Sequence, residues 1–524
     1  MSKNSRDQNA FDKAALDYHR QEPKGKIEVI PSKPHSSQRD LSLAYSPGVA
    51  VPCMAIHDDP QSVYEYTSKG NLVAVISNGT AVLGLGDIGP EASKPVMEGK
   101  GLLFKIFAGI NVFDIEINEK DPDKFIETVK AIAPTFGGIN LEDIKAPEAF
   151  YIEQRLKEEL DIPLMHDDQH GTAIISAAAL INALEIAGKK IDEVKMVING
   201  AGAAAIACAK LYISLGLDPK NILMCDSKGV INHKRENLTP EKLDFIAETE
   251  ISTLEDALKG SDVFVGLSKG NVMSPEMLLS MAKNPIVFAL ANPDPEISYD
   301  LAVATREDVM MATGRSDYPN QVNNVLGFPY IFRGALDVQA KGINEAMKLA
   351  AVYALAEIAK EPVPEMVKLA YNVRDISFGK DYFIPKPFDN RLITKVSIAV
   401  AKAAMESGIA GKSIENFQEY ENQLLDRMGR DEKLVRMMQN RAKANPKRVT
   451  LGNGEEYNIL KAAQILQEEG IAYPSLLGSK RLIKEKMEEY GITLDIPIID
   501  PNDDANKEAR KKYRKTLWDK RNRK

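Results

Sequence analysis

"VKMVINGAGAAAIACAKLYISLGLDPKNILMCD", residues 194–226, is the stretch that decides the fold of this chain. It opens with an apolar strand pattern, turns through two glycines, continues as an alanine-rich helix and closes with a second strand. A strand, a tight glycine turn, a helix and a second strand form the repeating unit of a parallel sheet. Further strand patterns alternate with helical ones on both sides, at 110–118 and 262–268 for example. We therefore predict an α/β protein.

Residues 200–205, Gly-Ala-Gly-Ala-Ala-Ala, match a dinucleotide-binding fingerprint with alanine in the third glycine position. Gly200 and Gly202 would let the backbone approach a pyrophosphate, and a helix N-terminus at Ala203 and Ala204 would favour its negative charge. An acid closes the next strand at position 226, 26 residues after Gly200 (226 − 200). This context predicts a Rossmann-type, parallel-sheet NAD(P)-binding domain. The alternative is a tight strand–helix turn without a ligand.

A second glycine match, "GLGDIG" at 84–89, has a poorer context. The sequence "GPEASKP" interrupts the expected helix start, and no acid ends a strand at the right distance. We interpret it as a turn that brings backbone close to another group.

The choice between NAD and NADP stays open on chemical grounds. Asp226 would bind both ribose hydroxyls and so favours NAD. Lys228 and the "HKR" at 233–235 are cations that could hold a 2′-phosphate.

Composition excludes several classes of protein. The chain has 524 residues and a formal net charge of -8, so it lacks the charge signature of a nucleic-acid-binding protein. Neither a run of about 20 apolar residues nor an apolar signal core is present, so we expect no membrane span and a cytoplasmic location. The three scattered cysteines fit a reducing compartment and exclude a cysteine-rich metal site.

Three domains are predicted. Residues 1–162 form an N-terminal α/β substrate domain, in which 72–89 is expected to be a strand, a turn and a second strand. Residues 163–428 form the NAD(P)-binding domain with the helices that follow it. Residues 429–524 begin with a charged helical linker and continue as the start of a third α/β domain, which is too short to complete an ordinary sheet.

Acidic residues gather in two short segments, "GGINLEDI" and "LMHDDQHGTA". His166 and His170 have the i, i+4 spacing of zinc proteases, but a third zinc ligand is missing. Glu142, Asp143 and one of Asp167 or Asp168 would instead offer the oxygen ligands that Mg²⁺ or Mn²⁺ prefers. A simpler alternative is that Asp168 only caps a helix that starts at 172.

Seven ordered motifs resemble the short bacterial malic enzymes: "LAYSPGVAVPC", "GLGDIG" with "KPVMEGK", "LEDI", "HDDQHGTA", "NGAGAAA", "ANPDPE" and "QVNNVLGFPYIFRGALD". The resemblance covers nearly everything from about residue 15 to 425. The tail from about 430 is similar to the beginning of a phosphate acetyltransferase domain, here cut short. The combination resembles the hybrid malic enzymes, in which the appended domain is thought to be regulatory.

The resemblance implies roles for five residues near the acids. Lys100 in "MEGK" matches the family's base for the malate hydroxyl, and Asp167 would hold it and tune its pKa. Glu142, Asp143 and Asp168 match the metal ligands, and the metal would polarise the hydroxyl and later stabilise the enolate.

The resemblance also implies roles for three further residues, and it has one departure. Tyr45 matches the acid that protonates the enol, while Asn292 and Asn324 match residues near the nicotinamide and the substrate carboxylate. Larger malic enzymes carry an arginine for a malate carboxylate where this chain has Ala81. Other groups must then bind that malate carboxylate, either the backbone amides of the 84–89 turn or Lys94.

The resemblance implies oxidative decarboxylation of (S)-malate to pyruvate and CO₂ with Mg²⁺ or Mn²⁺. "DSKG" resembles the NADP-using hybrids, so NADP is favoured over NAD. The rivals are a 2-hydroxy-acid dehydrogenase without decarboxylation and a nucleotide-sensing module. We expect a homo-oligomer, a dimer or larger, and an acetyl-CoA-type regulator if the C-terminal domain is complete. No nucleic-acid or membrane partner is expected.

Overall fold

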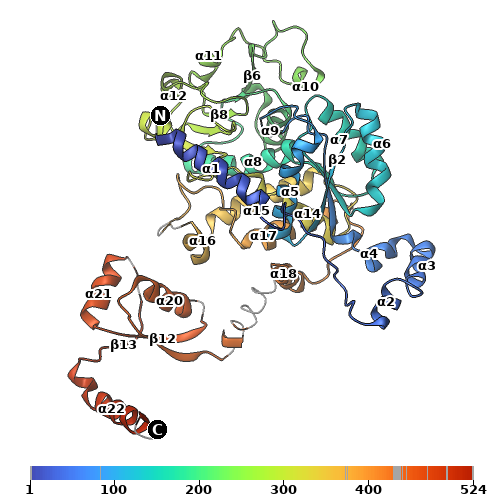
Figure 1. Cartoon of the computed structure of the whole chain (residues 1–524). Helices are drawn as coiled ribbons and strands as arrows, with labels where there is room; N and C mark the ends of the chain where they lie inside the picture. The colour runs from blue at the N-terminus through green and yellow to red at the C-terminus, as the bar shows by residue number, and fades with distance from the viewer. Residues whose placement is uncertain are drawn as a thin grey trace. The chain divides into compact units, whose positions relative to one another are not determined.

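A computed structural model describes residues 3–82, 84–371, 373, 376–428, 438, 441–443, 445–468, 470–490, 492 and 494–521 (Figure 1). The chain divides into two compact units, Met1–Arg427 and Met428–Lys524. The larger unit contains two parallel sheets, each followed by the helices that cover it.

The first sheet has four strands, all parallel, in the order β2-β1-β3-β4. Their bounds are β1 (Leu72–Ser77), β2 (Asn111–Glu116), β3 (Gly138–Leu141) and β4 (Leu164–His166). Helices α5 (Pro90–Ala108), α6 (Pro122–Ile132) and α7 (Glu148–Glu159) connect them. Strand β1 is central and every residue in it is buried, which explains its continuous apolar run. β4 lies beyond residue 162 in sequence but pairs with β3 in this sheet.

The second sheet has six strands in the order β10-β9-β8-β5-β6-β7, parallel except for the β6–β7 pair. Its strands are β5 (Met196–Asn199), β6 (Ile222–Asp226), β7 (Gly229–Val230), β8 (Val263–Gly266), β9 (Ile286–Ala289) and β10 (Met310–Thr313). The associated helices are α9 (Ala203–Ser214), α10 (Pro240–Leu243), α11 (Leu254–Leu258), α12 (Pro275–Ser280) and α13 (Tyr299–Thr305). The α/β class and the Rossmann-like parallel sheet are therefore confirmed.

Helix α8 (Asp167–Ala187) links the two sheets. It starts five residues earlier than the predicted residue 172, so the "DDQH" acids occupy its first turn and Asp168 does not precede the helix. Length and composition alone would let α8 cross a membrane, but 67% of its most apolar window is buried within the protein. It is a core helix that packs against α9 and α15 (Glu345–Lys360).

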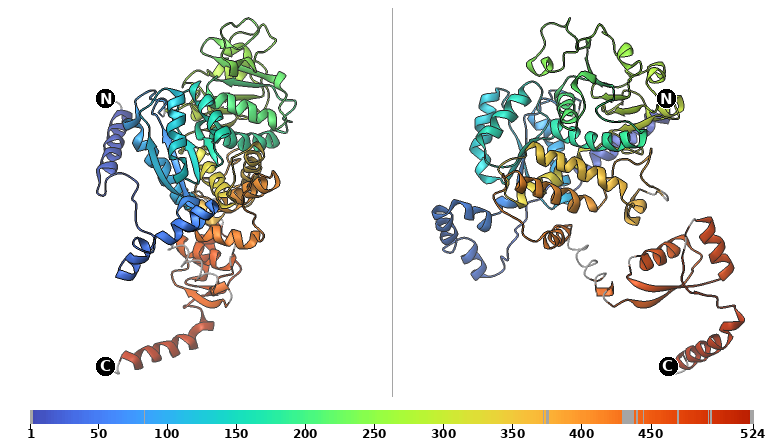
Figure 2. Two further views of the ribbon diagram at one scale, coloured as in Figure 1. Left: turned by 90° about the vertical axis from the view of Figure 1, so that its right-hand side faces the viewer. Right: turned by 180° about the vertical axis from the view of Figure 1, so that it is seen from behind.

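The remaining helices of this unit come from the two ends of its sequence (Figure 2). After β10 come the 3₁₀ turn η5 (Asn324–Leu326) and α14 (Phe328–Asp337), α16 (Glu365–Ala370), α17 (Arg391–Glu406) and α18 (Phe417–Asp426). The N-terminal segment holds α1 (Lys3–Arg20), α2 (Gln38–Ala44), α3 (Ala50–Asp58) and α4 (Val63–Tyr66). Helices α2 and α3 bury none of their residues and project from the body in both figures.

The 72–89 segment differs from its prediction in two ways. No second strand follows β1 among the described residues of this segment, where only an isolated bridge joins Val82 to Gly86. Helix α5 begins directly after the glycine turn, with Gly89 as its N-cap and Pro90 at its first position. "GPEASKP" therefore does not interrupt the helix: Pro90 begins it without losing an intrahelical hydrogen bond, and the helix continues past Pro95, which lies inside it.

The smaller unit opens as strand, helix, strand, helix, which agrees with the predicted start of an α/β domain. Its elements are β11 (Lys447–Leu451), α20 (Tyr457–Glu468), β12 (Ala472–Leu477), α21 (Lys480–Glu489), β13 (Ile498–Ile499) and α22 (Lys507–Arg521). A small core around Leu460, Leu476 and Ile483 joins β11, α20, β12, α21 and β13. Most of the predicted charged linker, 430–448, lies outside the described residues.

Candidate active site

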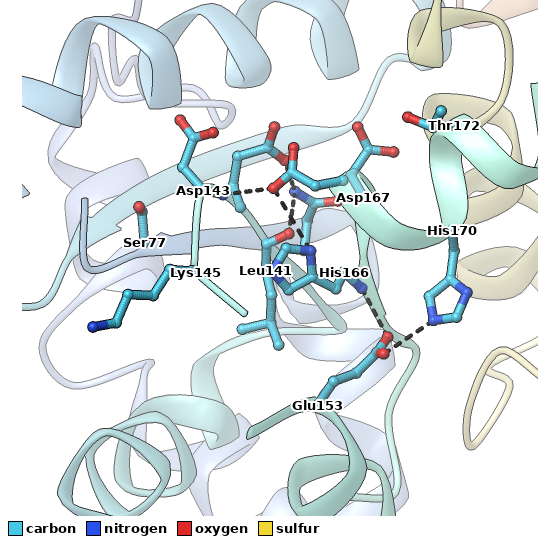
Figure 3. Close-up of polar contacts among 12 residues, drawn as sticks. Ser77, Leu141, Asp143, Lys145, Glu153, His166, Asp167, His170 and Thr172 are labelled. Atoms are coloured by element: carbon cyan, nitrogen blue, oxygen red, sulfur yellow. Dashed lines mark hydrogen bonds and ion pairs between the residues drawn. The ribbon is translucent and has the colours of Figure 1, made fainter. Parts of the chain in front are cut away.

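Three carboxylates converge at the carboxyl ends of β3 and β4. Glu142 and Asp143 follow β3, Asp168 follows β4, and one oxygen from each lies within 4.8 Å of the others. Because β3 and β4 are neighbouring parallel strands, their ends meet at one edge of the sheet. Asp168 Oδ2 also accepts the backbone N–H of Asp143 at 2.8 Å, which fixes the two segments together (Figure 3).

Lys100 from helix α5 reaches this cluster. Its Nζ lies 2.7 Å from Asp167 Oδ2 and 2.8 Å from Glu142 Oε1, and its side chain is 10% exposed. The Phe328 ring centroid lies 4.4 Å from the same nitrogen, within cation–π distance. Burial alone would lower the pKa of Lys100, but the Asp167 and Glu142 carboxylates raise it by more. The two effects oppose each other, as predicted for this lysine.

The carboxylates of the cluster repel one another electrostatically, and this repulsion contributes to their raised pKa values. Burial raises the pKa of Glu142 to about 8, with Lys100 opposing and the two neighbouring aspartates adding to the shift. Burial and the adjacent Asp143 carboxylate likewise raise the pKa of Asp168 to about 7. Buried carboxylates that disfavour each other's charge are stabilised by a cation between them. Three such oxygens fit a hard divalent cation such as Mg²⁺ or Mn²⁺.

The two histidines offer no ligand atom to this cluster, although the His166 Nδ1 lies 3.6 Å from Asp168 Oδ2. Among the described residues, the three carboxylates are the one converging group of potential metal ligands, and it contains no histidine. His166 is the N-cap of α8, and the His170 ring faces Glu153 on the opposite side of the turn (Figure 3). The i, i+4 spacing therefore does not build a zinc site.

Asn324 joins the lysine and the acids. Its Nδ2 donates to Asp167 Oδ2 at 3.1 Å, and its Oδ1 accepts from Thr172 Oγ1 at 3.2 Å. A Cβ at Gly171 would lie 2.1 Å from Asp167 Oδ1 and 2.9 Å from the Asn324 side chain. The glycine of "QHGTA" thus lets η5 approach the first turn of α8.

A separate cleft of about 720 Å³ opens at the carboxyl ends of β5 and β6. Gly200 has a φ of 137°, and a Cβ there would lie 2.5 Å from the Leu267 carbonyl oxygen. Gly202 is the N-cap of α9, whose first residues are Ala203 and Ala204, and nothing lies within 4 Å of where its Cβ would be. The turn therefore leaves room for a pyrophosphate beside unpaired helix N–H groups.

Asp226 sits in the same cleft between two cations. Arg235 donates to its Oδ2 at 2.9 Å and Lys242 at 3.2 Å, while the backbone N–H of Lys228 binds Oδ1 at 2.9 Å. Burial would raise the pKa of Asp226, but these hydrogen bonds lower it to about 2. The Lys228 side chain lines the cleft and makes no ion pair with a described residue.

Sequence reasoning missed Lys242. It lies on α10, 16 residues after Asp226 (242 − 226), and reaches the cleft from outside the strand–helix–strand unit. Of the "HKR" residues only Arg235 reaches Asp226, because His233 and Lys234 pair with Glu250 instead.

Asn292 and the 84–89 turn lie close to each other. Asn292 follows β9, and a Cβ at Gly84 would lie 3.3 Å from its carbonyl oxygen. This agrees with a turn that brings backbone close to another group. Ala81 donates its N–H to the Asp143 carbonyl oxygen at 3.0 Å, so it lies beside the carboxylate cluster.

Lys94 points to a different set of acids. Its Nζ lies 2.5 Å from Asp114 Oδ2 and within 4 Å of Glu98 and Glu116. An ammonium already shared by three carboxylates is a poor substrate ligand, which disfavours Lys94 as the carboxylate grip.

Tyr45 is the predicted site residue that the structure does not bring to the cluster. It follows α2 on the projecting segment, and 77% of its surface is exposed. No hydrogen bond or ring contact of its side chain with a described residue is present.

The fold and the cleft define a dinucleotide-binding α/β protein, and comparisons with known proteins narrow the class. The family pattern "Malic enzyme, N-terminal domain" matches residues 24–157, and "Malic enzyme, NAD binding domain" matches 169–378. "Phosphate acetyl/butaryl transferase" matches 433–524.

Three similar proteins extend over most of the chain. An NADP-dependent malic enzyme from Escherichia coli (strain K12) is 55% identical over 94% of this chain and 66% of its own length. One from Halomonas elongata is 60% identical over 76% of this chain and 94% of its own length. The crystal structure of a malic enzyme from Pyrococcus horikoshii is 43% identical with a TM-score of 0.74, covering 82% of this chain and 99% of its own.

The chain therefore belongs to the malic enzyme family. It spans about two thirds of the length of the longer curated relatives, such as the E. coli enzyme.

Proposed function

We propose that this chain converts (S)-malate and NADP⁺ to pyruvate, CO₂ and NADPH, with a divalent cation. Membership of the malic enzyme family supports the reaction class. The single observation that carries the chemistry is the buried Lys100 ammonium held between Asp167 and Glu142, because Glu142 also belongs to the three-carboxylate cluster. This geometry joins a proton-transfer group directly to a cation site.

In the proposed reaction, Lys100 acts as its neutral amine, a form favoured when a bound cation offsets the charge of Glu142. It takes the proton of the malate hydroxyl while the hydride passes from the same carbon to the nicotinamide of NADP⁺. Asp167 orients the lysine, since its Oδ2 accepts from Lys100 Nζ at 2.7 Å, and Asn324 Nδ2 donates to the same oxygen at 3.1 Å. Glu142, Asp143 and Asp168 would hold the Mg²⁺ or Mn²⁺, which polarises the hydroxyl and keto oxygens and stabilises the enolate charge when bound. Asn292 and the 200–204 turn would orient the nicotinamide cofactor.

In this proposal, Tyr45 protonates the enol in the last step. Its sequence motif, "LAYSPGVAVPC", is the only support for this role. The proposed acid and base act at different steps, so their variants should fail differently. Lys100→Ala should abolish malate oxidation. Tyr45→Phe should slow solvent-proton exchange at the pyruvate methyl group more than it slows hydride transfer, as measured by NMR and by NADPH absorbance. Exchange at the parent rate in Tyr45→Phe would remove that role.

NADP is the proposed cofactor because two cations already compensate the negative charge of the Asp226 carboxylate. Its carboxylate already pairs with Arg235 and Lys242, so it repels a 2′-phosphate less than a free carboxylate would. Lys228 remains available beside it. NAD is the alternative cofactor.

The proposed assembly is cytoplasmic and homo-oligomeric. An acetyl-CoA-type ligand is the proposed regulator of longer proteins of this type, acting through the domain whose beginning matches 433–524.

One assay distinguishes the proposed activity from its rivals. The full chain is incubated with malate, Mn²⁺ and either cofactor, and NADPH or NADH, CO₂ and pyruvate are quantified. Equal yields of reduced cofactor, CO₂ and pyruvate are expected. Reduced cofactor with oxaloacetate and without CO₂ would indicate a simple dehydrogenase. Cofactor binding without turnover would indicate a nucleotide-sensing module.

A further inference from the structure

Glu153 lies buried directly behind the turn that carries Asp167 and Asp168. Its Oε1 accepts the backbone N–H of His166 at 2.9 Å, and its Oε2 lies 3.0 Å from His170 Nε2 (Figure 3). Lys157, one turn along α7, places its Nζ 2.7 Å from the same carboxylate. Only 7% of the Glu153 side chain is exposed. One carboxylate therefore binds both ends of the first turn of α8.

This carboxylate occupies the place of a helix cap. Helix α8 begins after His166, which makes no side-chain hydrogen bond to cap it. The N-terminal N–H groups of a helix lack intrahelical partners, and a negative charge near them is stabilising. Glu153 supplies that charge from a different helix, so α7 fixes where α8 starts.

The charge of Glu153 is secured by its partners. Burial alone would raise its pKa, but His170, Lys157 and His166 lower the pKa of Glu153 well below the usual range of a glutamate. A charged carboxylate makes stronger hydrogen bonds than a neutral acid. The contact is therefore a charge-assisted anchor.

The opposite face of the anchored turn carries the proposed chemistry. Asp167 Oδ2 holds Lys100, and Asp168 supplies one oxygen of the three-carboxylate cluster. Glu153 binds His166 and His170 on the other side of this turn (Figure 3). It reaches Asp168 only through His166, whose Nδ1 lies 3.6 Å from Asp168 Oδ2. A shift of the turn would move both aspartates together, and errors of about 1 Å at a ligand site lower its affinity and rate strongly.

We propose that Glu153, supported by His170 and Lys157, is a positioning residue that sets the affinity of the cluster for Mg²⁺ or Mn²⁺. The inference rests on the cation site of the proposed function and goes beyond it, because Glu153 touches neither the cluster nor Lys100. It also gives the two histidines of "HDDQH" a role: His166 donates its backbone N–H to Glu153, and His170 contacts Glu153 with its ring.

The test measures cation binding in the full chain without substrate. Mn²⁺ is the probe, and free Mn²⁺ is counted by electron paramagnetic resonance, with NADPH binding followed by fluorescence in the same samples. Glu153→Gln keeps an oxygen for the His166 N–H and removes the charge. Supporting partners of metal ligands typically contribute about ten- to a hundred-fold to metal affinity. We expect the Kd for Mn²⁺ to rise about ten-fold and the Kd for NADPH to stay within two-fold.

Two controls separate positioning from general stability. Glu159→Gln removes a carboxylate from the same helix that pairs with Lys130 and Arg155, away from α8, and should leave both Kd values unchanged. Hydrogen exchange at the start of α8, measured without metal, should become faster in Glu153→Gln and not in Glu159→Gln. If Glu153→Gln does not fold, the same measurements are made on His170→Asn. We expect this variant to raise the Kd for Mn²⁺ by a smaller factor.

An unchanged Mn²⁺ Kd in a folded Glu153→Gln protein would overturn the inference. So would equal losses of Mn²⁺ and NADPH affinity, which would indicate a structural role. A parent chain that binds no Mn²⁺ would overturn this inference and the proposed cation site together. A parent that binds Mn²⁺ and oxidises malate, with Glu153 variants unaffected, would overturn this inference alone.

Discussion

The sites at the two sheets of the larger unit are built from different kinds of chemical group. At the four-stranded sheet, buried side chains meet one another: Lys100 bridges Asp167 and Glu142. At the six-stranded sheet, the cleft opens over Gly200 and Gly202, which have no Cβ, beside the ion-paired Asp226 and the side chain of Lys228. The first site is specified by charge, the second by the absence of side-chain volume.

This difference determines how each site should fail. A buried charge network loses its function when one partner is removed, because the others are left uncompensated. A glycine turn fails when atoms are added, because the added Cβ meets backbone that cannot move away. Substitutions that remove a charge should therefore affect the cation site, and substitutions that add a methyl group should affect the dinucleotide cleft.

The largest effect is expected for Asp168→Ala. The substitution removes one oxygen from the three-carboxylate cluster and the acceptor of the Asp143 N–H. We expect Mn²⁺-dependent kcat/KM for malate to fall by at least about a hundred-fold, the scale of losing one electrostatic group at a reacting centre. NADPH affinity, measured by fluorescence, should stay unchanged. Asp161→Ala, at an exposed position just before β4, is the matched control. Turnover at the parent rate in Asp168→Ala would contradict the cation site.

Two alanine substitutions in the glycine turn should differ from each other. Gly200→Ala forces a side chain onto a φ of 137° and places its Cβ 2.5 Å from a carbonyl oxygen, so it should destabilise the protein by about 1–3 kcal/mol and weaken NADP binding. Gly202→Ala meets nothing within 4 Å and should leave the melting temperature nearly unchanged. It should still raise the Kd for NADP by about ten-fold or more, because its methyl group would occupy the space of the pyrophosphate.

Melting curves and NADP titrations of both variants provide the measurement. Mn²⁺ affinity should be retained by Gly202→Ala. Tight NADP binding by Gly202→Ala would mean that the pyrophosphate lies elsewhere, and the contrast between the two sheets would lose its basis.

The helices and strands that carry both sites were predicted from the sequence better than the residues that contact one another within the sites. The strand, turn, helix and acid at 194–226 are local, so their pattern predicted β5, α9 and β6 in the right order. Glu142, Asp143 and one of Asp167 or Asp168 were also predicted to meet, because their oxygens suit Mg²⁺ or Mn²⁺. Resemblance to a family, not spacing, identified Lys100, because 67 residues separate it from Asp167 and only the packing of α5 brings them together.

What the sequence did not predict depends on tertiary packing. Lys242 belongs to a short helix whose approach to Asp226 has no periodic signal. The start of α8 at Asp167 was missed because its cap comes from Glu153 on another helix, while local rules look for a capping side chain at the N-cap itself. The interruption expected at "GPEASKP" was wrong because prolines were taken as helix breakers where one of them begins the helix.

The smallest effects concern the choice of cofactor and separate Lys228 from Lys242. Lys228 makes no ion pair with a described residue, so Lys228→Ala should remove only a contact to the 2′-phosphate. Losing one charge-assisted contact corresponds to about 1.5 kcal/mol, or roughly ten-fold in affinity. The KM for NADP should rise by about that factor, and the KM for NAD should barely move.

Lys242→Ala should act on both cofactors in opposite directions. The substitution removes a cation from the cleft and leaves Asp226 with Arg235 as its remaining ion-pair partner among the described residues. A more negative Asp226 repels a 2′-phosphate and accepts ribose hydroxyls better, so the KM for NADP should rise by about ten-fold while that for NAD falls slightly. Steady-state kinetics with both cofactors measure the two ratios, and Lys234→Ala, whose ammonium pairs with Glu250, is the control. Equal changes for NAD and NADP would mean that Lys242 only supports the fold. A parent enzyme that already prefers NAD would show that Asp226 sets the choice despite its two cations.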